Sequence, residues 1–197
     1  MKFLVATQNE GKKEEYRELL DGLRAEIVFP DDLGLELNVR EDGTTYAQNA
    51  LKKARAFASA SRLLTIADDS GLEVDALSGA PGLHSARYAE GTDADRVDKL
   101  LEAMSAVPWE ERTARFRCVL VVITHSSRVV ESEGICEGVI ALEPQGEGGF
   151  GYDPIFYVPG RGRTMAQLPR KTKNRISHRA RAVQGALPAL AELLAGA

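Results

Sequence analysis

Residues 63–71 of this chain, from which its architecture is predicted, read Leu63-Leu64-Thr65-Ile66-Ala67-Asp68-Asp69-Ser70-Gly71. Its apolar half predicts a buried strand over residues 63–67, and the residues after it predict a turn. Because side chains alternate between the faces of a strand, Asp68 and Asp69 should point in opposite directions. Burying an unpaired carboxylate is costly, so a cation, donors or solvent must meet each one. Ligands of open α/β sheets bind at the carboxyl ends of strands, so we expect a ligand site here, with a plain strand-ending turn as the alternative.

Strand-like and helix-like segments alternate on both sides of this stretch. Apolar spacing predicts further strands over residues 2–7, 25–29, 35–39, 113–124, 128–142 and 155–158. It predicts helices over residues 10–23, from a Thr45 cap to about residue 60, from a Thr92 or Asp93 cap to Met104, and from about residue 177, with a kink or end at Pro188. Residues 113–142 are typical of a long hairpin that turns near His125. The order of elements predicts an α/β fold with a mixed sheet, as one domain over residues 1–197.

The composition is that of an ordinary soluble globular protein. Of 197 residues, 44% are hydrophobic and 27% charged, enough for a substantial core. The longest apolar run, residues 119–123, falls far short of the roughly 20 residues of a membrane helix, and the N-terminal run is too short for a signal peptide. We therefore expect a cytoplasmic protein with no membrane partner. Cys118 and Cys136 have no metal-ligand spacing, and their strand-like surroundings on either side of the turn near His125 make them candidate cross-strand neighbours. The simplest interpretation is two buried thiols in a reducing compartment.

The charge is unevenly distributed along the chain. The formal net charge is −4, yet residues 154–191 carry eight Lys or Arg and no acid, whereas residues 1–153 have a balance of −11. One basic segment on an acidic body favours a local anion site over a nucleic-acid surface. An RNA- or DNA-binding module that uses residues 161–181 is the alternative from another class of protein.

Thr7-Gln8-Asn9-Glu10-Gly11-Lys12 stands at a predicted strand-to-helix junction. The backbone N–H groups and the dipole of a helix N-terminus suit a phosphate, and Lys12 adds a positive charge. The segment is not a Walker P-loop, because Lys13 follows Lys12 where that pattern has Ser or Thr. An ordinary helix cap with a solvated lysine is the alternative.

The segment Gly146–Pro154 contains the spacing Gly-x-Gly-x-x-Gly. A dinucleotide site needs a helix that opens at these glycines, whereas Asp153-Pro154 and a strand-like run follow, so we reject that interpretation. A loop that exposes Phe150 and Tyr152 beside Asp153 predicts a platform for a planar ring, with a carboxylate for its donors. A hairpin corner with packed aromatic rings is the alternative.

Residues 171–181 place His178 and Arg179 in a polar cluster at a helix start. Such side chains can donate to ring oxygens or to phosphates. A structural histidine on a solvated, charged helix face is the alternative.

Six blocks of sequence, in order from residue 6 to residue 179, closely resemble the inosine triphosphate pyrophosphatase family of house-cleaning nucleotidases. The blocks are Ala6-Thr7-x-Asn9-x-Gly11-Lys12, Asn49-Ala50-x-x-Lys53-Ala54, Ala67-Asp68-Asp69-Ser70-Gly71-Leu72, Gly79-x-Pro81-Gly82-x-x-Ser85-Ala86-Arg87, Gly148-Gly149-Phe150-Gly151-Tyr152-Asp153-Pro154 and Ile176-Ser177-His178-Arg179. The resemblance implies an elongated two-lobed α/β fold around a long mixed sheet flanked by helices, with a nucleotide cleft between the lobes. It also implies Mg²⁺ dependence and a homodimer.

The resemblance further implies roles for single residues. Asp69 would be the catalytic general base and a Mg²⁺ ligand, with Ser70 beside it as a substrate contact. Glu41 would be the second Mg²⁺ ligand, although Asp42 next to it is an alternative. Lys53 matches the family too, and either a phosphate contact or a solvated helix face accounts for it.

The implied substrate contacts are spread over the chain. The phosphates would be held by Thr7, Asn9, Gly11 and Lys12, with Lys173 near the nucleotide. The base and sugar would be bound by Phe150, Gly151, Tyr152, Asp153, His178 and Arg179.

The implied reaction is attack of water on the α-phosphorus of ITP, dITP or XTP, which releases pyrophosphate and a nucleoside monophosphate. Hypoxanthine and xanthine carry an oxygen acceptor at the six-position, so donors such as His178 and Arg179 would be opposed by the amino group of adenine. Two alternatives stay open among enzymes. One is a pyrophosphatase for modified pyrimidine or ordinary nucleotides. The other, more distant, is a serine hydrolase that uses Ser70 or Ser85 with His84 or His178, although the usual Gly-x-Ser-x-Gly elbow is missing.

Overall fold

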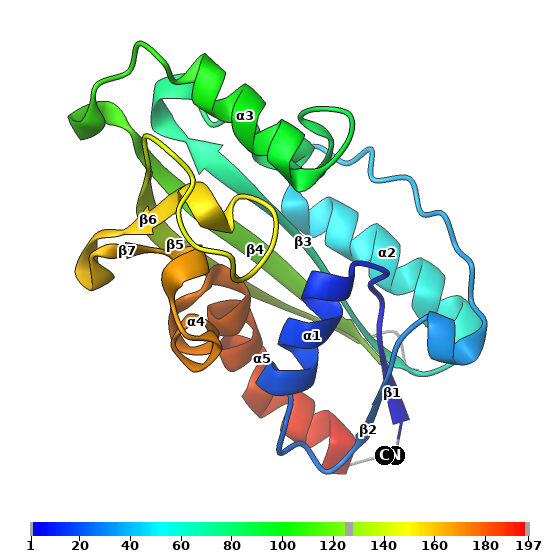
Figure 1. Ribbon diagram of the computed structural model, residues 1–197. Coiled ribbons are helices and arrows are strands. Elements are labelled where there is room, and N and C mark those ends of the chain that lie inside the picture. The colour runs from blue at the N-terminus through cyan, green and yellow to red at the C-terminus, as the bar shows by residue number, and fades with distance from the viewer. Residues whose placement is uncertain (1, 125–127, 196–197) are drawn as a thin grey trace. The chain divides into compact units, whose positions relative to one another are not determined.

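The computed structural model describes residues 2–124 and 128–195, whose helices pack on a mixed sheet (Figure 1). Among these residues, strands form a sheet in the order β2-β1-β3-β4-β5-β6-β7. The strands are β1 (Lys2–Val5), β2 (Glu26–Val28), β3 (Leu64–Val74), β4 (Thr113–Ile123), β5 (Val129–Ile140), β6 (Phe156–Val158) and β7 (Arg163–Thr164). The helices are α1 (Glu10–Leu19), α2 (Tyr46–Ser61), α3 (Asp93–Ala103), α4 (Arg170–Ile176) and α5 (His178–Ala195). Strand β1 is parallel to β2 and β3, whereas β6 is antiparallel to β5 and β7, so the predicted mixed α/β sheet is confirmed.

The chain divides into two compact units, each built from segments that are distant in sequence. The first unit contains Met1–Asp69, Cys118–Gly134 and Arg179–Ala197, and the second contains Ser70–Arg117 and Ile135–His178. Strands β3, β4 and β5 each contribute residues to both units. The interpretation of residues 1–197 as one two-lobed domain stays a prediction.

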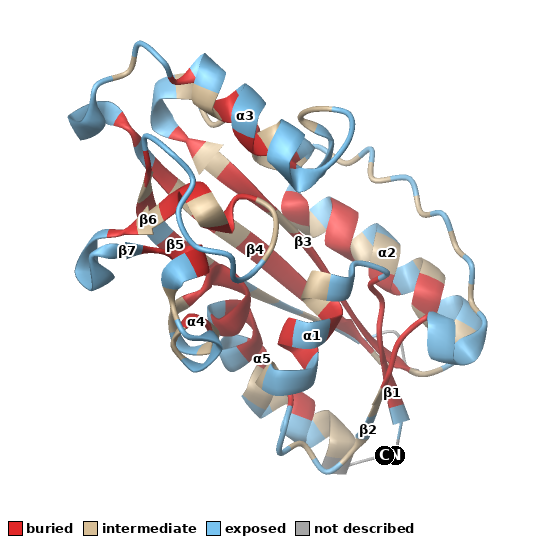
Figure 2. Ribbon diagram, viewed as in Figure 1, coloured by how far each residue is buried: buried red, intermediate tan, exposed pale blue. Residues whose placement is uncertain are grey.

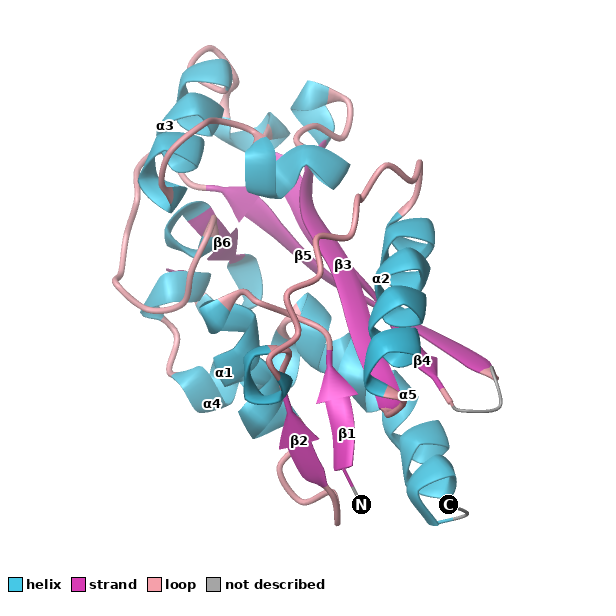
Figure 3. Ribbon diagram, turned by 90° about the vertical axis from the view of Figure 1, so that its right-hand side faces the viewer, coloured by secondary structure: helices cyan, strands magenta, loops and turns pink. Residues whose placement is uncertain are grey.

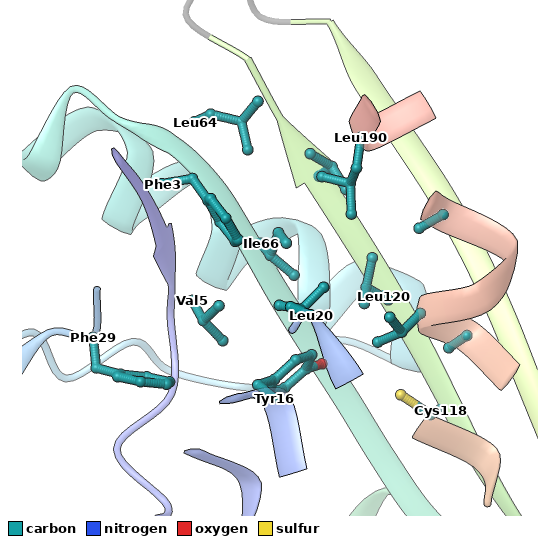
Figure 4. Packing of buried hydrophobic residues seen from close by; sticks show 14 residues of the cluster. Phe3, Val5, Tyr16, Leu20, Phe29, Leu64, Ile66, Cys118, Leu120 and Leu190 are labelled. Carbon is teal, nitrogen blue, oxygen red and sulfur yellow. The ribbon is translucent and has the colours of Figure 1, made fainter. Parts of the chain in front are cut away.

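In the first unit, alternating side chains of the strands build a core on each face of the sheet. One core joins α1 and α5 to the strands through Phe3, Val5, Tyr16, Ile66, Leu120, Val122, Val183 and Leu190, and Figure 4 shows its packing. The opposite core joins α2 to the strands through Leu4, Ala6, Ala50, Ala54, Phe57, Ala67, Val121 and Ile123. Figure 3 shows α2 lying along one face of β3. The nearly continuous apolar runs of β1 and β4 are what a sheet covered on both faces requires.

The second unit has a core of its own beneath α3. It contains Leu72, Val74, Phe116, Ile140, Tyr152 and Phe156 from the rest of the unit, and Val97, Leu100 and Met104 from the helix and its C-cap. Figure 2 shows that α3 buries one side and exposes the other. Leu101 is partly buried at the edge of this apolar face. Thr92 caps the helix in a complete capping box with Asp95, as one of the two predicted caps.

Strand β3 corrects the prediction of a turn at the carboxylates. The strand does not end at Ala67 but continues through Asp68, Asp69 and Ser70 to Val74. Its parallel neighbour β1 pairs with it only as far as Ile66, and β4 is its neighbour on the other side. The chain therefore stays extended beyond the end of β1 because it keeps a partner strand. The two carboxylates lie next to the carboxyl end of β1, inside a strand.

One predicted strand and two predicted element ends in the first 62 residues are wrong. Residues 35–39 form no strand, because Leu35, Leu37 and Val39 pack against the α2 core without a pairing partner among the described elements. Strand β1 ends at Val5 and α1 ends at Leu19, both earlier than expected. Helix α2 begins where expected, since the Thr45 side chain accepts from Gln48 N. The Gln48 side chain in turn accepts from the backbone N–H of Thr44, one residue before the cap.

The C-terminal third contains more regular structure than its sequence pattern predicts. The expected basic loop includes β7 and α4. Helix α5 begins at His178, close to the expected start, and continues past Pro188, which lies on its exposed side. Strands β4 and β5 are neighbours as the hairpin predicts, while the predicted turn at His125 falls on residues 125–127, outside the described residues. In the described part of the chain, the helices are too short or too polar to span a membrane.

Candidate functional site

Asp68 and Asp69 meet different partners, as their alternation in a strand predicts. Lys12 Nζ lies 2.8 Å and Arg179 Nη2 3.2 Å from Asp68 Oδ2, so Asp68 faces α1 and α5. The Nδ2 group of Asn49 donates to Asp69 Oδ2 at 3.0 Å, so Asp69 faces α2. Both aspartates are buried. The cations and donors that a buried carboxylate needs are therefore present on each face.

Asp68 is the centre of a buried ionic cluster in the first unit. Arg179, which is 1% exposed, bridges Asp68 to the buried carboxylate of Glu15. Burial alone would raise the pKa of Asp68, but the positive charges of Lys12, Arg179 and Lys53 hold that pKa well below its usual value. Cys118 Sγ lies 3.7 Å from the same carboxylate oxygen, and burial raises the pKa of this thiol. The surrounding cations therefore favour the ionised form of Asp68, and this carboxylate in turn orients Lys12 and Arg179.

The N-terminus of α1 brings the predicted phosphate-binding residues together. Asn9 caps the helix by accepting from Lys12 N at 2.9 Å, and Thr7 Oγ1 accepts from Asn9 N at 3.3 Å. The Lys12 side chain is 16% exposed and forms the accessible edge of the ionic cluster. Lys13 points elsewhere, because its ammonium pairs with Asp31 and Glu10. Gly11 lies in the same first turn and is partly exposed.

Asp69 has the environment of a proton acceptor. Burial raises the pKa of Asp69 and the charge of Glu41 raises it further, while the hydrogen bond from Asn49 and the charge of Lys12 partly oppose this rise. A carboxylate whose pKa is moved towards neutral pH is better suited to general base catalysis than an ordinary surface aspartate. Ser70 follows Asp69 in the strand and is partly exposed.

Glu41 is connected to this site through Lys53. The Lys53 ammonium pairs with Glu41 and donates to the carbonyl oxygen of Asp68 at 2.9 Å, and its side chain is 17% exposed. The alternative of a solvated Lys53 is therefore wrong. Asp42 is paired at the surface with Lys52 instead, which favours Glu41 over Asp42 as a ligand near Asp69. The helical spacing along α2 could have indicated that Lys53 is not solvated, since Lys53 lies one turn after buried Asn49 on the same face.

The carboxylates suit a hard divalent cation that also binds the substrate. Among the described residues, no group of three or more His, Cys, Asp and Glu side chains is arranged to hold a metal by itself. Mg²⁺ is usually bound through one or two carboxylates together with substrate phosphates. Glu41 and Asp69 fit this pattern, because Asn49 and Lys53 connect the segment that carries Glu41 to Asp68 and Asp69. The charge of Glu41 also raises the pKa of Asp69, and a cation would relieve that repulsion.

In the second unit, Asp153 is the centre of another polar cluster. Its carboxylate accepts from Phe150 N at 3.0 Å and pairs with the buried ammonium of Lys173. Lys173 Nζ also lies 5.0 Å from the centroid of the Phe150 ring, within cation–π range. Gly149 has φ +74°, and a Cβ there would overlap the Asp153 carboxylate. The positive φ and the lack of space for a Cβ each require glycine at position 149, so this loop is shaped around Asp153.

Tyr152 corrects the prediction of an exposed aromatic pair. It is 4% exposed, and its hydroxyl donates to the carbonyl oxygen of Ser85 at 2.9 Å, so it packs in the core, as the alternative for this loop has it. Phe150 is only partly buried. Gly151 N donates to Asp93 at 2.6 Å, which ties the loop to α3. Ser85 has a structural environment, since its hydroxyl donates to Gly82 O at 2.6 Å, and this disfavours the serine hydrolase.

His178 and Arg179 are adjacent in sequence but belong to different units. The ring of His178 stacks on Phe116 in the second unit, with centroids 4.7 Å apart. Arg179 extends into the first unit, where it contacts Asp68 and Glu15. Glu15 was not predicted as part of this cluster. The only local indication of its role is its position in α1 beside the apolar residues Tyr16 and Leu20.

Cys118 and Cys136 are buried thiols that are not joined in a disulfide, as predicted. They pack in different hydrophobic cores.

Known proteins resemble this chain along nearly its whole length. It is 48% identical over 195 residues to a dITP/XTP pyrophosphatase of Desulforamulus reducens, covering 98% of this chain and 97% of that protein. It is 48% identical over 193 residues to the dITP/XTP pyrophosphatase of Escherichia coli, covering 96% of this chain and 98% of that protein. A HAM1 protein structure from Coxiella burnetii superposes with a TM-score of 0.85 at 40% identity and covers 100% of both chains. The model of the Ham1 family matches residues 3–189, and the chain therefore belongs to the Ham1 family.

Proposed function

We propose that this chain hydrolyses dITP, ITP and XTP to the nucleoside monophosphate and pyrophosphate. The observation that supports this proposal most strongly is that the adjacent residues Asp68 and Asp69 lie in different electrostatic environments. Asp68 is held ionised among cations, while Asp69, with its raised pKa, faces Asn49 and the charge of Glu41. The names of the relatives, dITP/XTP pyrophosphatase, support the choice of substrate.

Asp69 accepts a proton from the water that attacks the α-phosphorus. A triphosphate repels an incoming nucleophile, so cations and oriented donors must offset its charge. The N-terminus of α1 supplies a cation and oriented donors, from Thr7, Asn9, Gly11 and Lys12. Lys12 lies beside Asp68, which limits the number of positions its ammonium can adopt. Ser70 adds a hydroxyl next to Asp69.

Glu41 and Asp69 hold a divalent cation, which we propose is Mg²⁺. When bound, Mg²⁺ neutralises charge on the phosphate oxygens. Lys53 keeps Glu41 close to the Asp68 backbone by bonding to both.

The residues of the Phe150 loop bind the base and sugar. Phe150 offers a partly exposed ring for a purine, and Lys173 offers a cation beside it. Gly151 and Asp153 shape the loop, and buried Tyr152 supports it from the core.

Selectivity comes from donors that face the purine six-position. His178 donates to an oxygen there, whereas the N–H groups of Phe150 and Gly151 already donate to Asp153 and Asp93. Adenine places an amino group in the same position, which leaves the His178 donor unsatisfied. Arg179 completes the predicted set, and we assign it a supporting role through Asp68 and Glu15.

We further propose a cytoplasmic homodimer that binds neither nucleic acid nor membrane. The concentration of basic residues after residue 154, balanced by the acidic remainder, supports a small anionic ligand over a nucleic acid. Light scattering of the purified protein should give twice the chain mass of 21.4 kDa.

A nucleoside triphosphate panel tests the proposed activity. Purified protein is given dITP, ITP, XTP, ATP, GTP and dUTP, and pyrophosphate release is measured with and without Mg²⁺. We expect release from the first three, only with a divalent cation. Equal cleavage of ATP and ITP would contradict the account of the base site, and release of orthophosphate alone would contradict attack at the α-phosphorus.

Asp69→Asn tests the assigned proton acceptor. The amide preserves the shape of the side chain but accepts no proton, so turnover should fall by about 10²–10⁴-fold. The dissociation constant for dITP, measured without metal, should stay near the wild-type value. Turnover close to wild type would remove Asp69 from this role.

A further inference from the structure

Helix α2 carries two side chains that each join the Glu41–Gly43 segment to the Asp68–Asp69 pair. Asn49 donates to Asp69 Oδ2 at 3.0 Å and accepts at Oδ1 from Gly43 N at 2.7 Å. Lys53 donates to the carbonyl oxygen of Asp68 at 2.9 Å and pairs with Glu41. Residues four apart lie on one face of a helix, so the two connections are adjacent.

The Asn49 position is closely matched to its two partners. The side chain is 1% exposed. A carboxamide donates to a carboxylate and accepts from a backbone N–H at the same time, whereas a carboxylate has no donor. Gly43 approaches so closely that a Cβ there would lie 2.6 Å from Asn49 Oδ1. Asn49 and Gly43 therefore form a contact that depends on the identity of both residues.

We infer that Asn49 is a positioning residue that holds the Asp69 carboxylate at a set distance from the segment carrying Glu41. The inference rests on the proposed function, because Glu41 and Asp69 are the carboxylates assigned to the divalent cation. Two carboxylates that share one ion lose affinity for it when either moves. Groups that orient metal ligands in this way typically contribute about 10–100-fold to metal affinity or activity.

The effect should appear in cation dependence and turnover rather than in nucleotide affinity. The two hydrogen bonds of the Asn49 side chain go to Asp69 and Gly43, while the proposed phosphate contacts lie at the start of α1. A purely structural role for Asn49 would lower stability without a selective change in the Mg²⁺ requirement.

Two variants break the same contact from opposite sides. Asn49→Ala removes both hydrogen bonds. Gly43→Ala, in a partly exposed loop, adds a Cβ that would lie 2.6 Å from Asn49 Oδ1 and 2.8 Å from Gln48 Cβ, so it separates Gly43 N from the first turn of α2. Gln48→Ala is the matched control, because exposed Gln48 on the same helical turn accepts at 2.8 Å from the N–H of Thr44, the residue that follows the Glu41–Gly43 segment. Thermal denaturation establishes that each variant is folded.

Steady-state kinetics with dITP and Mn²⁺ binding to the protein by electron paramagnetic resonance give the readouts. We expect Asn49→Ala and Gly43→Ala to lower kcat and to weaken Mn²⁺ binding, each by about 10–100-fold, with a matching rise in the Mg²⁺ concentration at half-maximal rate. The metal-free dissociation constant for dITP should change by less than about twofold, and Gln48→Ala should behave like wild type.

Wild-type kcat and Mn²⁺ affinity in either folded variant would overturn the inference, as would a loss of metal-free dITP affinity equal to the loss of kcat/KM. Failure of the proposed function is distinguishable. If wild-type protein releases no pyrophosphate from any nucleotide, the proposed function falls, and Mn²⁺ binding by the three variants still decides whether Asn49 positions the carboxylates.

Discussion

Replacing Arg179 by Met should destabilise the protein strongly, because it leaves two carboxylates buried without their shared cation. The Arg179 guanidinium is fully buried and pairs with Glu15 and with Asp68, the latter at 3.2 Å. Methionine keeps much of the length and volume of arginine but removes the charge and all donors. The experiment therefore measures the loss of charge compensation with little change in packing.

The size of the effect follows from the partners that remain. Removing one partner of a buried ion pair costs about 3–5 kcal/mol. Asp68 keeps Lys12 at 2.8 Å, so part of its penalty is offset and the penalty at Glu15 dominates. We expect the free energy of unfolding to fall by about 3–4 kcal/mol. For a domain of this size, each kcal/mol lowers Tm by about 2–4 °C, which gives a fall of roughly 6–16 °C.

Urea denaturation followed by circular dichroism, together with thermal scans, measures this change. Arg181→Met is the matched control on the exposed side of the same helix, and it should change the unfolding free energy by less than about 0.5 kcal/mol. The double variant Glu15→Gln/Arg179→Met removes one of the stranded carboxylates and should recover about 1–2 kcal/mol relative to Arg179→Met. If Arg179→Met were no less stable than Arg181→Met, the reasoning about the buried cluster would be refuted.

Two further predictions concern Lys13 and the Phe150 loop. Hydrogen bonds to Asp31 and Glu10 raise the pKa of Lys13, so the stabilisation it provides is present below the unfolded lysine pKa of about 10.4 and is lost as pH rises through the higher folded value. Lys13→Met should therefore lower the urea midpoint of unfolding at pH 8. The difference between the urea midpoints of wild type and variant should narrow above about pH 10.4. A difference that stays constant with pH would contradict this prediction. Gly149→Ala should raise KM for dITP by about tenfold or more, because a Cβ would overlap Asp153. Gly151→Ala is the control for backbone strain, because Gly151 has a similar positive φ but open space around its Cβ position. If KM rose equally in Gly149→Ala and Gly151→Ala, the effect would come from backbone strain and not from the overlap with Asp153.

Much of the local structure was predictable because short-range chemistry decides it. Thr45 and Thr92 cap their helices through the residue three positions later, and both caps are visible in the sequence. The opposite directions of Asp68 and Asp69 follow from the period of a strand. The rejection of a dinucleotide helix at Gly146–Gly151 also held, because a 3₁₀ turn and β6 follow the loop.

Errors arose where a distant partner overrides a local pattern. The Asp-Asp-Ser-Gly stretch resembles a turn, yet β3 continues through it beside β4, which begins at residue 113. Residues 35–39 alternate like a strand but pack on α2 instead. The loop around Tyr152 looked exposed, and the tyrosine is buried against a carbonyl 67 residues away in sequence.

The residue types of the site, the order of its motifs and the opposite faces of the two aspartates can be read from the sequence, since they depend on spacings of a few residues. Which charges meet depends on the folded chain. Arg179 reaches Glu15 across 164 positions and Asp68 across 111, and Asn49 links Asp69 to Gly43. No local propensity encodes such pairings, because the energy of a buried charge depends on the groups that folding brings around it.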